Sequence, residues 1–240
     1  MLESKKILIT GASKGIGKAL ALKLANSGCI LCLTARNMTK SEDLINKLKE
    51  SGIQYFLFDA DLSKQNDIKK TYEYFKTNAG EIDILINNAG RGIFSPINEE
   101  KPEQIKEILD LNIFGLIYLT NLCSEDLIKN KGTIVNISSV AGRKGFQGLS
   151  VYCASKWAVI GFTESLRDEL CSKNVKVMCI EPGLVDTEWG ENLPDTFKQY
   201  KESVDMLTPD DIADIIYFAI MTPDNVCLNE ILVRPTNQPR

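Results

Sequence analysis

The sequence predicts an α/β fold, doubly wound, in which a seven-stranded parallel sheet is covered by helices on both faces. Seven short, nearly continuous apolar runs alternate with longer amphipathic segments. Strands that are apolar along their whole length are typical of a parallel sheet buried on both sides. The alternation runs through all 240 residues without a linker, an internal repeat or a low-complexity tract. We therefore expect one catalytic domain over residues 1–240.

The same alternation places each element along the chain. Strands are expected over residues 6–10, 30–34, 54–58, 84–87, 133–137, 175–180 and 230–233. Helices are expected over residues 15–27, 40–51, 65–78, 101–129, 151–172 and 209–221. Right-handed crossovers then leave only a few possible topologies.

Two of these helices carry more apolar residues than contact with the sheet requires. Residues 105–122 are apolar on nearly all sides, and Val159, Phe162, Leu166 and Leu170 recur at helical spacing in the helix after Tyr152. A helix that is apolar all round must be covered. A central position in the fold would cover it, and so would a second subunit. We favour a homodimer or homotetramer.

Composition narrows the possible partners. The net charge is −4 with a pI near 5.1, and no basic block is present, so nucleic acid and anionic membrane surfaces are not expected. No apolar run approaches the roughly 20 residues of a membrane-spanning helix, and the N-terminus does not have the pattern of a signal peptide.

Cysteine and histidine usage does not favour a metal site. Cys29 and Cys32 form a C-x-x-C within an apolar run that is typical of a buried strand, and the chain has no histidine. A redox C-x-x-C usually opens a helix, and zinc would need further ligands. We therefore expect buried, reduced thiols in a cytoplasmic protein, with no metal.

A glycine-rich turn follows the first predicted strand and opens the first predicted helix. Its sequence is Gly11-Ala12-Ser13-Lys14-Gly15-Ile16-Gly17, with the spacing G-x-x-x-G-x-G. Glycines there let the backbone turn sharply and approach a pyrophosphate, and the helix N-terminus offers N–H groups to phosphate. The position predicts a dinucleotide site, although a glycine cluster alone could be only a tight turn.

The end of the second strand indicates which nucleotide binds. An NAD site usually carries an acid there for the ribose 2′-hydroxyl, whereas this chain has Arg36, with Lys14 nearby in the glycine turn. A guanidinium suits a 2′-phosphate, so we favour NADP(H). The alternative is that both cations are ordinary surface charges.

Further nucleotide contacts are expected where the third and fourth strands end. Asp61-Leu62 could meet the adenine, and Asn87-Asn88-Ala89-Gly90 lies where such sheets bind ligands. A loop that caps its strand is the alternative for the asparagines, because their side chains often satisfy backbone groups.

A tyrosine and a lysine four residues apart supply the candidate chemistry. Tyr152 and Lys156 would project from one helix face, after the serines of Ser138-Ser139-Val140-Ala141-Gly142. A nearby ammonium favours a phenolate, and a hydroxyl from another element could hold the group that exchanges the proton. The arrangement suits acid–base work on a carbonyl or alcohol.

Together these residues resemble the short-chain dehydrogenase/reductase family over the entire chain. The matching pieces, in the family's order and spacing, are the Thr10–Gly17 turn, Asp61-Leu62, Asn87–Gly90, Asn112, Ser139, Tyr152-x-x-x-Lys156, and Pro182-Gly183 with Thr187. The resemblance implies a Rossmann sheet, and dimers or tetramers built on the two long helices.

The resemblance also implies roles. Tyr152 would be the general acid in reduction and the general base in oxidation, and Lys156 would bind the nicotinamide ribose and stabilise the tyrosinate. Ser139, which has the family's spacing where Ser138 does not, would bind the substrate oxygen. Asn112 would hold a water in a proton relay.

For the sixth strand, the resemblance implies that Pro182-Gly183 would face the nicotinamide and that Thr187 would bond its carboxamide. Residues 186–204 are irregular and polar and carry Trp189 and Phe197, which predicts a lid. The tail ends in Pro235-x-x-Gln238, which resembles serine and 3-hydroxy acid dehydrogenases. Arg143 would be a solvent-exposed loop residue, or else would meet a substrate carboxylate.

The expected function is an NADP(H)-dependent oxidoreductase that interconverts a small-molecule alcohol, such as a 3-hydroxy acid, and its carbonyl. One alternative is a broad-range carbonyl or diketone reductase. Another, from a different class, is a regulatory protein that binds NADP(H) without turnover.

Overall fold

Seven parallel strands form one sheet in the order β3-β2-β1-β4-β5-β6-β7. The structure is a computed structural model that describes residues 2–189 and 193–239. The strands are β1 (Lys6–Thr10), β2 (Ile30–Ala35), β3 (Gln54–Asp59), β4 (Ile84–Asn87), β5 (Thr133–Ile137), β6 (Lys176–Pro182) and β7 (Glu230–Val233). The strand order reverses between β1 and β4, which is where doubly wound sheets open a ligand crevice. The predicted Rossmann arrangement is confirmed.

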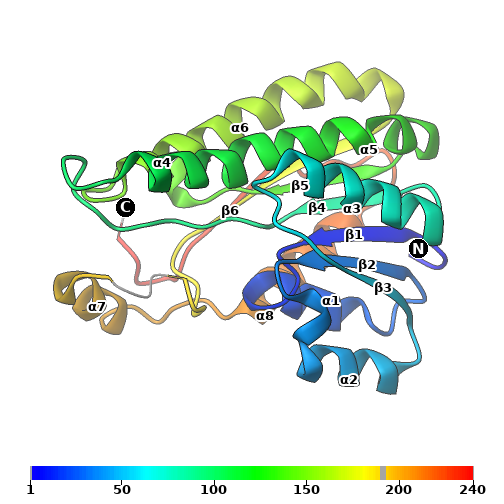
Figure 1. Cartoon of the computed structure of the whole chain (residues 1–240), viewed down its shortest axis with the longest axis horizontal. Coiled ribbons are helices and arrows are strands. Elements are labelled where there is room, and N and C mark those ends of the chain that lie inside the picture. Colours follow the sequence, from blue (N-terminus) through cyan, green and yellow to red (C-terminus); the bar gives the residue numbers. More distant parts are fainter. Residues whose placement is uncertain (1, 190–192, 240) are drawn as a thin grey trace.

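Helices cover both faces of the sheet (Figure 1). On one face lie α1 (Gly15–Leu24), α2 (Glu42–Ser51) and α8 (Pro209–Ile220). On the other lie α3 (Gln65–Asn78), α4 (Pro102–Leu109), α5 (Leu116–Asn130) and α6 (Ser150–Leu170). Two separate apolar cores result, one beneath each helix layer.

Local signals set the ends of several elements. The Thr208 hydroxyl accepts a hydrogen bond from the Asp211 amide at 3.1 Å, and the Asp211 carboxylate accepts from the Thr208 amide at 2.7 Å. This reciprocal cap, followed by Pro209, starts α8. Helix α2 stops at Gly52, whose φ of +71° is the left-handed conformation that glycine adopts without strain.

The single helix predicted over residues 101–129 is wrong in one respect. The structure divides it into α4, a π-helical turn η2 (Asp110–Gly115) and α5. Gly115 shows the reason, because a Cβ there would lie 2.2 Å from the Leu62 carbonyl oxygen. The π turn accommodates this close approach and leaves Asn112 only 1% exposed.

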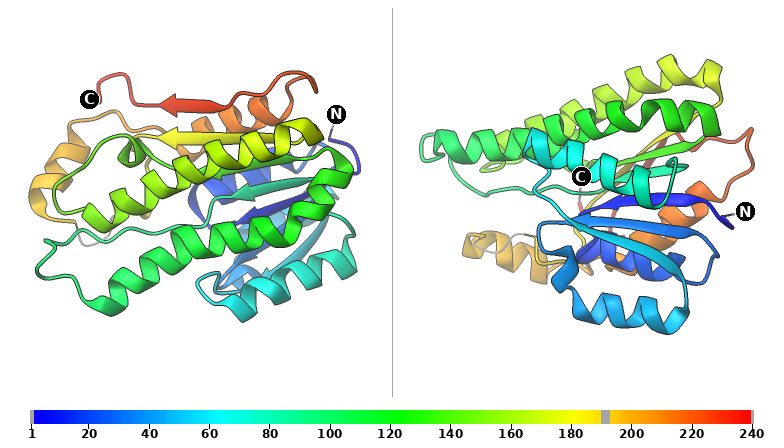
Figure 2. Two further views of the ribbon diagram at one scale, coloured as in Figure 1. Left: turned by 90° about the horizontal axis from the view of Figure 1, so that it is seen from above. Right: turned by 45° about the vertical axis from the view of Figure 1, so that its right-hand side comes forward.

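The segment predicted to be irregular over residues 186–204 is partly helical. Helix α7 (Asp195–Glu202) occupies it, while residues 190–192 of the predicted lid lie outside the described residues. Helix α7 stands beyond the carboxyl ends of the strands, on the same side as the C-terminus (Figures 1 and 2). The remaining differences are shifts of one to three residues at element ends and short 3-10 turns at η1 (Met38–Lys40), η3 (Val140–Gly142) and η4 (Cys171–Lys173).

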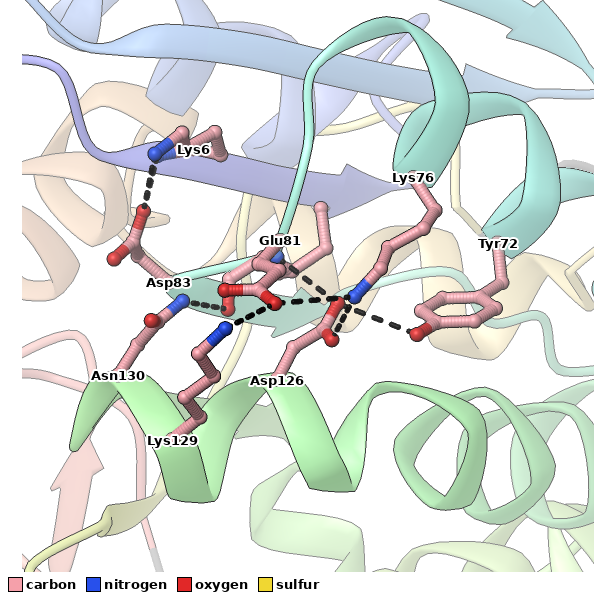
Figure 3. A network of polar contacts seen from close by, with 9 residues as sticks. Lys6, Tyr72, Lys76, Glu81, Asp83, Asp126, Lys129 and Asn130 are labelled. Carbon is pink, nitrogen blue, oxygen red and sulfur yellow. Dashed lines mark hydrogen bonds and ion pairs between the residues drawn. The ribbon is translucent and has the colours of Figure 1, made fainter.

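A buried polar network ties α3 and α5 to the amino end of β4, opposite the crevice (Figure 3). The Asp126 carboxylate is 3% exposed, accepts from the Ile82 amide at 3.2 Å and from the Tyr72 hydroxyl at 3.3 Å, and pairs with Lys76. All of the interactions of Asp126 lie at this end of the sheet, so it stabilises the fold at the end opposite the ligand crevice.

Cys29 and Cys32 are buried and free, and burial raises the pKa of the Cys32 thiol to about 12. Among the described residues, none of the helices combines the length and apolarity that crossing a membrane requires.

Candidate active site

The glycine turn fits a pyrophosphate. Gly11 and Gly15 have φ values of +63° and +53°, and a Cβ on Gly17 would lie 2.4 Å from the Gly11 carbonyl oxygen. The first turn of α1 carries no acidic residue and no side chain caps it, so its N–H groups are available to an anion. Ser13, Lys14 and Ile16 stand in the same turn, and Ile16 lines the central cavity.

Asn88 holds this turn in place from the neighbouring strand. Its Nδ2 donates to the carbonyl oxygens of Thr10 at 2.8 Å and Gly11 at 3.2 Å. The Thr10 hydroxyl in return accepts from the backbone amides of Asn88 and Ala89, both at 2.9 Å. The capping interpretation of Asn88 therefore describes its side chain, which also lines the cavity together with Gly90.

The two cations proposed to bind the 2′-phosphate of the nucleotide differ in their ion pairing. Arg36 is exposed at the end of β2 and forms no close ion pair with a described carboxylate, although its charge helps to lower the pKa of Asp61. Lys14 is exposed and forms an ion pair with Glu188 at 2.5 Å. Arg36 is therefore free to meet a 2′-phosphate, whereas Lys14 would first have to leave Glu188.

Asp61 and Leu62 follow β3, where the sequence placed adenine contacts. The Asp61 carboxylate accepts from the Ser63 hydroxyl at 2.7 Å and from its amide at 3.1 Å, and these bonds lower its pKa despite desolvation. Leu62 is 5% exposed and belongs to the core beneath α3 and α5.

The two serines after β5 have different surroundings. Ser138 is 3% exposed, and its hydroxyl donates to the Lys156 carbonyl oxygen at 2.9 Å, which ties the strand to α6. The Ser139 hydroxyl accepts from the Ala141 amide at 3.1 Å and donates to the Pro182 carbonyl oxygen at 3.3 Å. Ser139 is partly exposed and lies next to the Tyr152 side chain.

Tyr152 and Lys156 lie on the buried face of α6. The Lys156 Nζ lies 5.7 Å from the centre of the Tyr152 ring and donates to the Ile137 carbonyl oxygen at 2.8 Å. Burial raises the pKa of Tyr152 to about 12, which the adjacent Ser139 hydroxyl partly offsets. Burial lowers the pKa of Lys156 to about 8. The Tyr152 hydroxyl therefore keeps its proton at neutral pH.

Asn112 joins the π turn to this group. Its Nδ2 donates to the Arg91 carbonyl oxygen at 2.8 Å and to the Ser155 hydroxyl at 3.0 Å, and its Oδ1 accepts from the Arg91 amide at 2.9 Å. A Cβ on Gly90 would lie 3.3 Å from Asn112 Oδ1 and 3.5 Å from Lys156 Nζ. Asn112 therefore lies within the same cluster as Lys156.

Arg143 lies in the turn after η3 and is exposed, as expected, but its guanidinium is also held by two carboxylates, which the sequence did not predict. Its guanidinium donates to the carboxylate of Glu181, which is fully buried, and pairs with Glu230 at 2.6 Å. Arg143 is also absent from the cavity lining. A buried carboxylate requires a cationic partner, and Arg143 supplies it.

The cavity lies over Tyr152, Ser139 and Lys156 and has a volume of about 170 Å³. Pro182, Gly183 and Thr187 form one wall, as expected for β6 and the segment after it. Gln238 completes this wall, because its Oε1 accepts from the Leu184 amide at 3.0 Å. The sequence offered the Pro-x-x-Gln tail as a family likeness only, so this contact was missed.

Strand order, a glycine turn at the start of α1 and a buried tyrosine–lysine pair define a nucleotide-binding oxidoreductase of the Rossmann class. A model of the short chain dehydrogenase family matches residues 5–197. The chain belongs to this family.

Named relatives agree with the assignment. An NADP-dependent 3-hydroxy acid dehydrogenase of Schizosaccharomyces pombe is 34% identical over 99% of this chain and 95% of its own length. An uncharacterized oxidoreductase of Listeria monocytogenes is 36% identical over 99% of both chains.

Two solved structures with the same fold hold NADP+ or a derivative. An alcohol dehydrogenase of the archaeon Thermococcus sibiricus complexed with 5-hydroxy-NADP superposes with a TM-score of 0.89 and 28% identity, over 98% of each chain. The closed form of a serine dehydrogenase complexed with NADP+ gives a TM-score of 0.86 and 29% identity, over 98% of this chain and 96% of that one.

Proposed function

We propose that the protein is an NADP(H)-dependent oxidoreductase that interconverts an alcohol and its carbonyl compound, and that residues 1–240 act as one catalytic unit. One observation carries the proposal. Ser139, Tyr152 and Lys156, which come from the β5–α6 region, line a single cavity with Asn88 and Gly90 at the end of β4. A proton donor thereby lies beside the nucleotide crevice.

We infer that the cofactor would lie along this crevice and beyond it, over the ends of β1, β2 and β3. The glycine turn would bind the pyrophosphate, Arg36 the 2′-phosphate, and Asp61-Leu62 the adenine side. Ala89, Gly90, Pro182, Gly183, Thr187 and Lys156 would surround the nicotinamide riboside. When bound, the nicotinamide supplies or accepts the hydride.

The remaining chemistry is that of the chain's own side chains. In reduction, the Tyr152 hydroxyl donates its proton to the carbonyl oxygen of the substrate, and the Ser139 hydroxyl donates a hydrogen bond to the same oxygen. The Lys156 ammonium compensates the phenolate that forms. Asn112 positions the π turn beside Lys156 and would hold the water through which the proton is replaced. In oxidation, these transfers run in reverse.

The oligomeric state and the cellular compartment of the protein form part of the proposal. Phe114 on the π turn and Trp157 on α6 are 42% and 54% exposed, which supports a homodimer or homotetramer built on these helices. All seven cysteines are free, which supports a reducing compartment, the cytoplasm.

The test compares wild type with Tyr152→Phe. Wild type should be stabilised against heat by NADPH more than by NADH, and should consume NADPH with carbonyl substrates. Tyr152→Phe should keep the NADPH stabilisation and lose turnover by about 10²–10⁴-fold. Tyr217→Phe, on α8, is the matched control and should behave as wild type.

The alternatives predict different results. A catalytically silent NADP(H)-binding protein would leave wild type and Tyr152→Phe equally inactive on every carbonyl compound while both still bound NADPH. A broad-range reductase would turn over aldehydes, ketones and diketones at similar rates. Stabilisation by neither nucleotide would refute the proposal.

A further inference from the structure

Aromatic side chains from three separate segments enclose the cavity beside Tyr152. Phe146 precedes α6, Trp189 follows β6, and Phe197 and Tyr200 belong to α7. The rings of Trp189 and Tyr152 have centroids 5.2 Å apart, and those of Phe197 and Tyr200 are 5.8 Å apart. The space next to the phenol is therefore bounded by aromatic rings, which favour a flat apolar group.

One polar atom in this wall lacks a partner. The Trp189 Nε1–H is buried and finds no acceptor among the described residues. A buried donor left unsatisfied costs roughly 1–3 kcal/mol. Because Trp189 lines the cavity, a bound ligand that presents an oxygen acceptor to the indole would satisfy this donor.

The charges around the cavity are of one sign. Among the described lining residues Lys156 and Lys201 are cationic, and none is an aspartate or glutamate. Lys156 lies against Tyr152 and belongs to the proposed proton chemistry. Lys201 is half-buried on α7, and the structure pairs its ammonium with no described carboxylate. By contrast Lys198, on the same helix, pairs with Asp195 at 3.0 Å.

We propose that the substrate is an aromatic or similarly flat, apolar carbonyl compound that carries an anionic group, and that Lys201 binds this anion. The inference rests on the proposed function and names the substrate class of the same site. Ring contacts with Phe146, Trp189 and Phe197 hold the apolar body of the substrate. Lys201 binds the anionic group at the end of the substrate opposite the carbonyl. The carbonyl end meets Tyr152 and Ser139.

Other substrate classes leave part of this wall unused. The carboxylate of a short aliphatic hydroxy acid would reach Lys201, but its carbon chain would not fill the space between the aromatic side chains. A neutral aromatic ketone would fill the space between the aromatic side chains and leave the Lys201 charge without a partner. Arg143, the other cation considered for a substrate carboxylate, is already paired with Glu181.

Four aldehydes test separately how much the aromatic ring and the negative charge of the substrate contribute to kcat/KM. They are 4-formylbenzoate, its methyl ester, 4-oxobutanoate and butanal, each assayed with NADPH and the full chain. Wild type should give its highest kcat/KM with 4-formylbenzoate. Lys201→Met should lower that value about tenfold and leave the methyl ester within about twofold. Lys198→Met is the matched control and should leave all four values unchanged.

Equal kcat/KM for the acid and its ester in wild type, or equal losses for both in Lys201→Met, would overturn the role of Lys201. Equal values for 4-formylbenzoate and 4-oxobutanoate would overturn the aromatic requirement. If NADPH stabilises the protein but 4-formylbenzoate neither reacts nor adds stabilisation to the NADPH complex, the substrate class is wrong. Absence of stabilisation by NADPH itself would instead overturn the proposed function.

Discussion

Arg143 and Glu181 form a two-pronged ion pair in which Nε donates to Oε2 and Nη2 to Oε1, each at 2.7 Å. Arg143 follows the η3 turn that begins after Ser139, and Glu181 immediately precedes Pro182, whose carbonyl oxygen accepts from the Ser139 hydroxyl. The pair therefore joins the two segments that meet at the serine. A buried charge left without its partner is strongly unfavourable.

Replacing Arg143 should be costly for this reason. Arg143→Met leaves the Glu181 carboxylate buried and unpaired, and we expect a loss of about 3 kcal/mol in the free energy of unfolding by urea. Glu181→Gln/Arg143→Met should recover part of that loss, because it removes both charges. Glu230→Gln is the control: this outer carboxylate is 40% exposed and should cost about 0–1 kcal/mol. Equal losses in the Arg143 and Glu230 variants would contradict the interpretation.

The buried Lys156 should make stability depend on pH. Its pKa is lowered from 10.5 to about 8 in the folded protein, so between these values the unfolded chain binds more protons than the folded one. Stability from this residue is therefore lower at neutral pH and rises as the pH rises through this window.

Lys156→Met isolates the effect of this lysine from that of the other titratable groups of the chain. From about pH 8 to about pH 9.5, values inside that window, wild type should gain about 1–2 kcal/mol relative to the variant. Urea unfolding of both proteins at the two pH values measures the difference. A constant difference would mean that Lys156 titrates normally in the folded state.

The strands and the places of the candidate site residues on them could be predicted from sequence because they depend on local pattern. β1 and β5 are short apolar runs, and the glycine turn is specified by backbone demands that only glycine meets at Gly15 and Gly17. Tyr152 and Lys156 lie on one helix face because of their spacing alone.

Contacts between distant residues could not be predicted in this way. Arg143 and Glu181 are 38 positions apart, so nothing local marks them as partners. Helix α7 has a mostly polar sequence, and its aromatic side lies toward Phe94, with Phe197 at 6.1 Å between ring centres. The π turn likewise depends on a close approach between Gly115 and the carbonyl oxygen of Leu62, which lies on a different element.

Arg36 and Lys14 should contribute unequally to the choice of cofactor. Arg36→Ala removes an exposed guanidinium that forms no close ion pair with a described carboxylate, and should weaken NADPH binding about tenfold with little effect on NADH. Lys14→Ala should have a smaller effect, because Lys14 must first break its pair with Glu188.

Glu188→Gln sharpens this comparison. Freeing Lys14 should strengthen NADPH binding by about two- to threefold, in line with the small free energy of an exposed ion pair. Nucleotide titrations followed by thermal stabilisation give all three values, with Lys40→Ala as the control for a nearby exposed cation. An unchanged preference for NADPH in Arg36→Ala would refute the role of Arg36.

Trp157 provides the test of self-association. An indole that is 54% exposed on α6 is unusual for a surface that faces only water, and Phe114, 42% exposed, stacks on Tyr118 at 5.6 Å near the start of α5. If these rings form an interface, a charge introduced there must be buried without a partner when subunits meet.

Trp157→Glu should therefore shift the protein to monomers in sedimentation velocity at concentrations where wild type is a dimer or tetramer. Ile97→Glu is the matched control, because Ile97 is 63% exposed but belongs to the loop before α4 and to neither α5 nor α6. Since Trp157 neighbours Lys156, NADPH-dependent stabilisation is measured in parallel: a variant that dissociates yet keeps it has lost only the interface. A wild-type monomer, or dissociation by both variants, would contradict an interface built on α5 and α6.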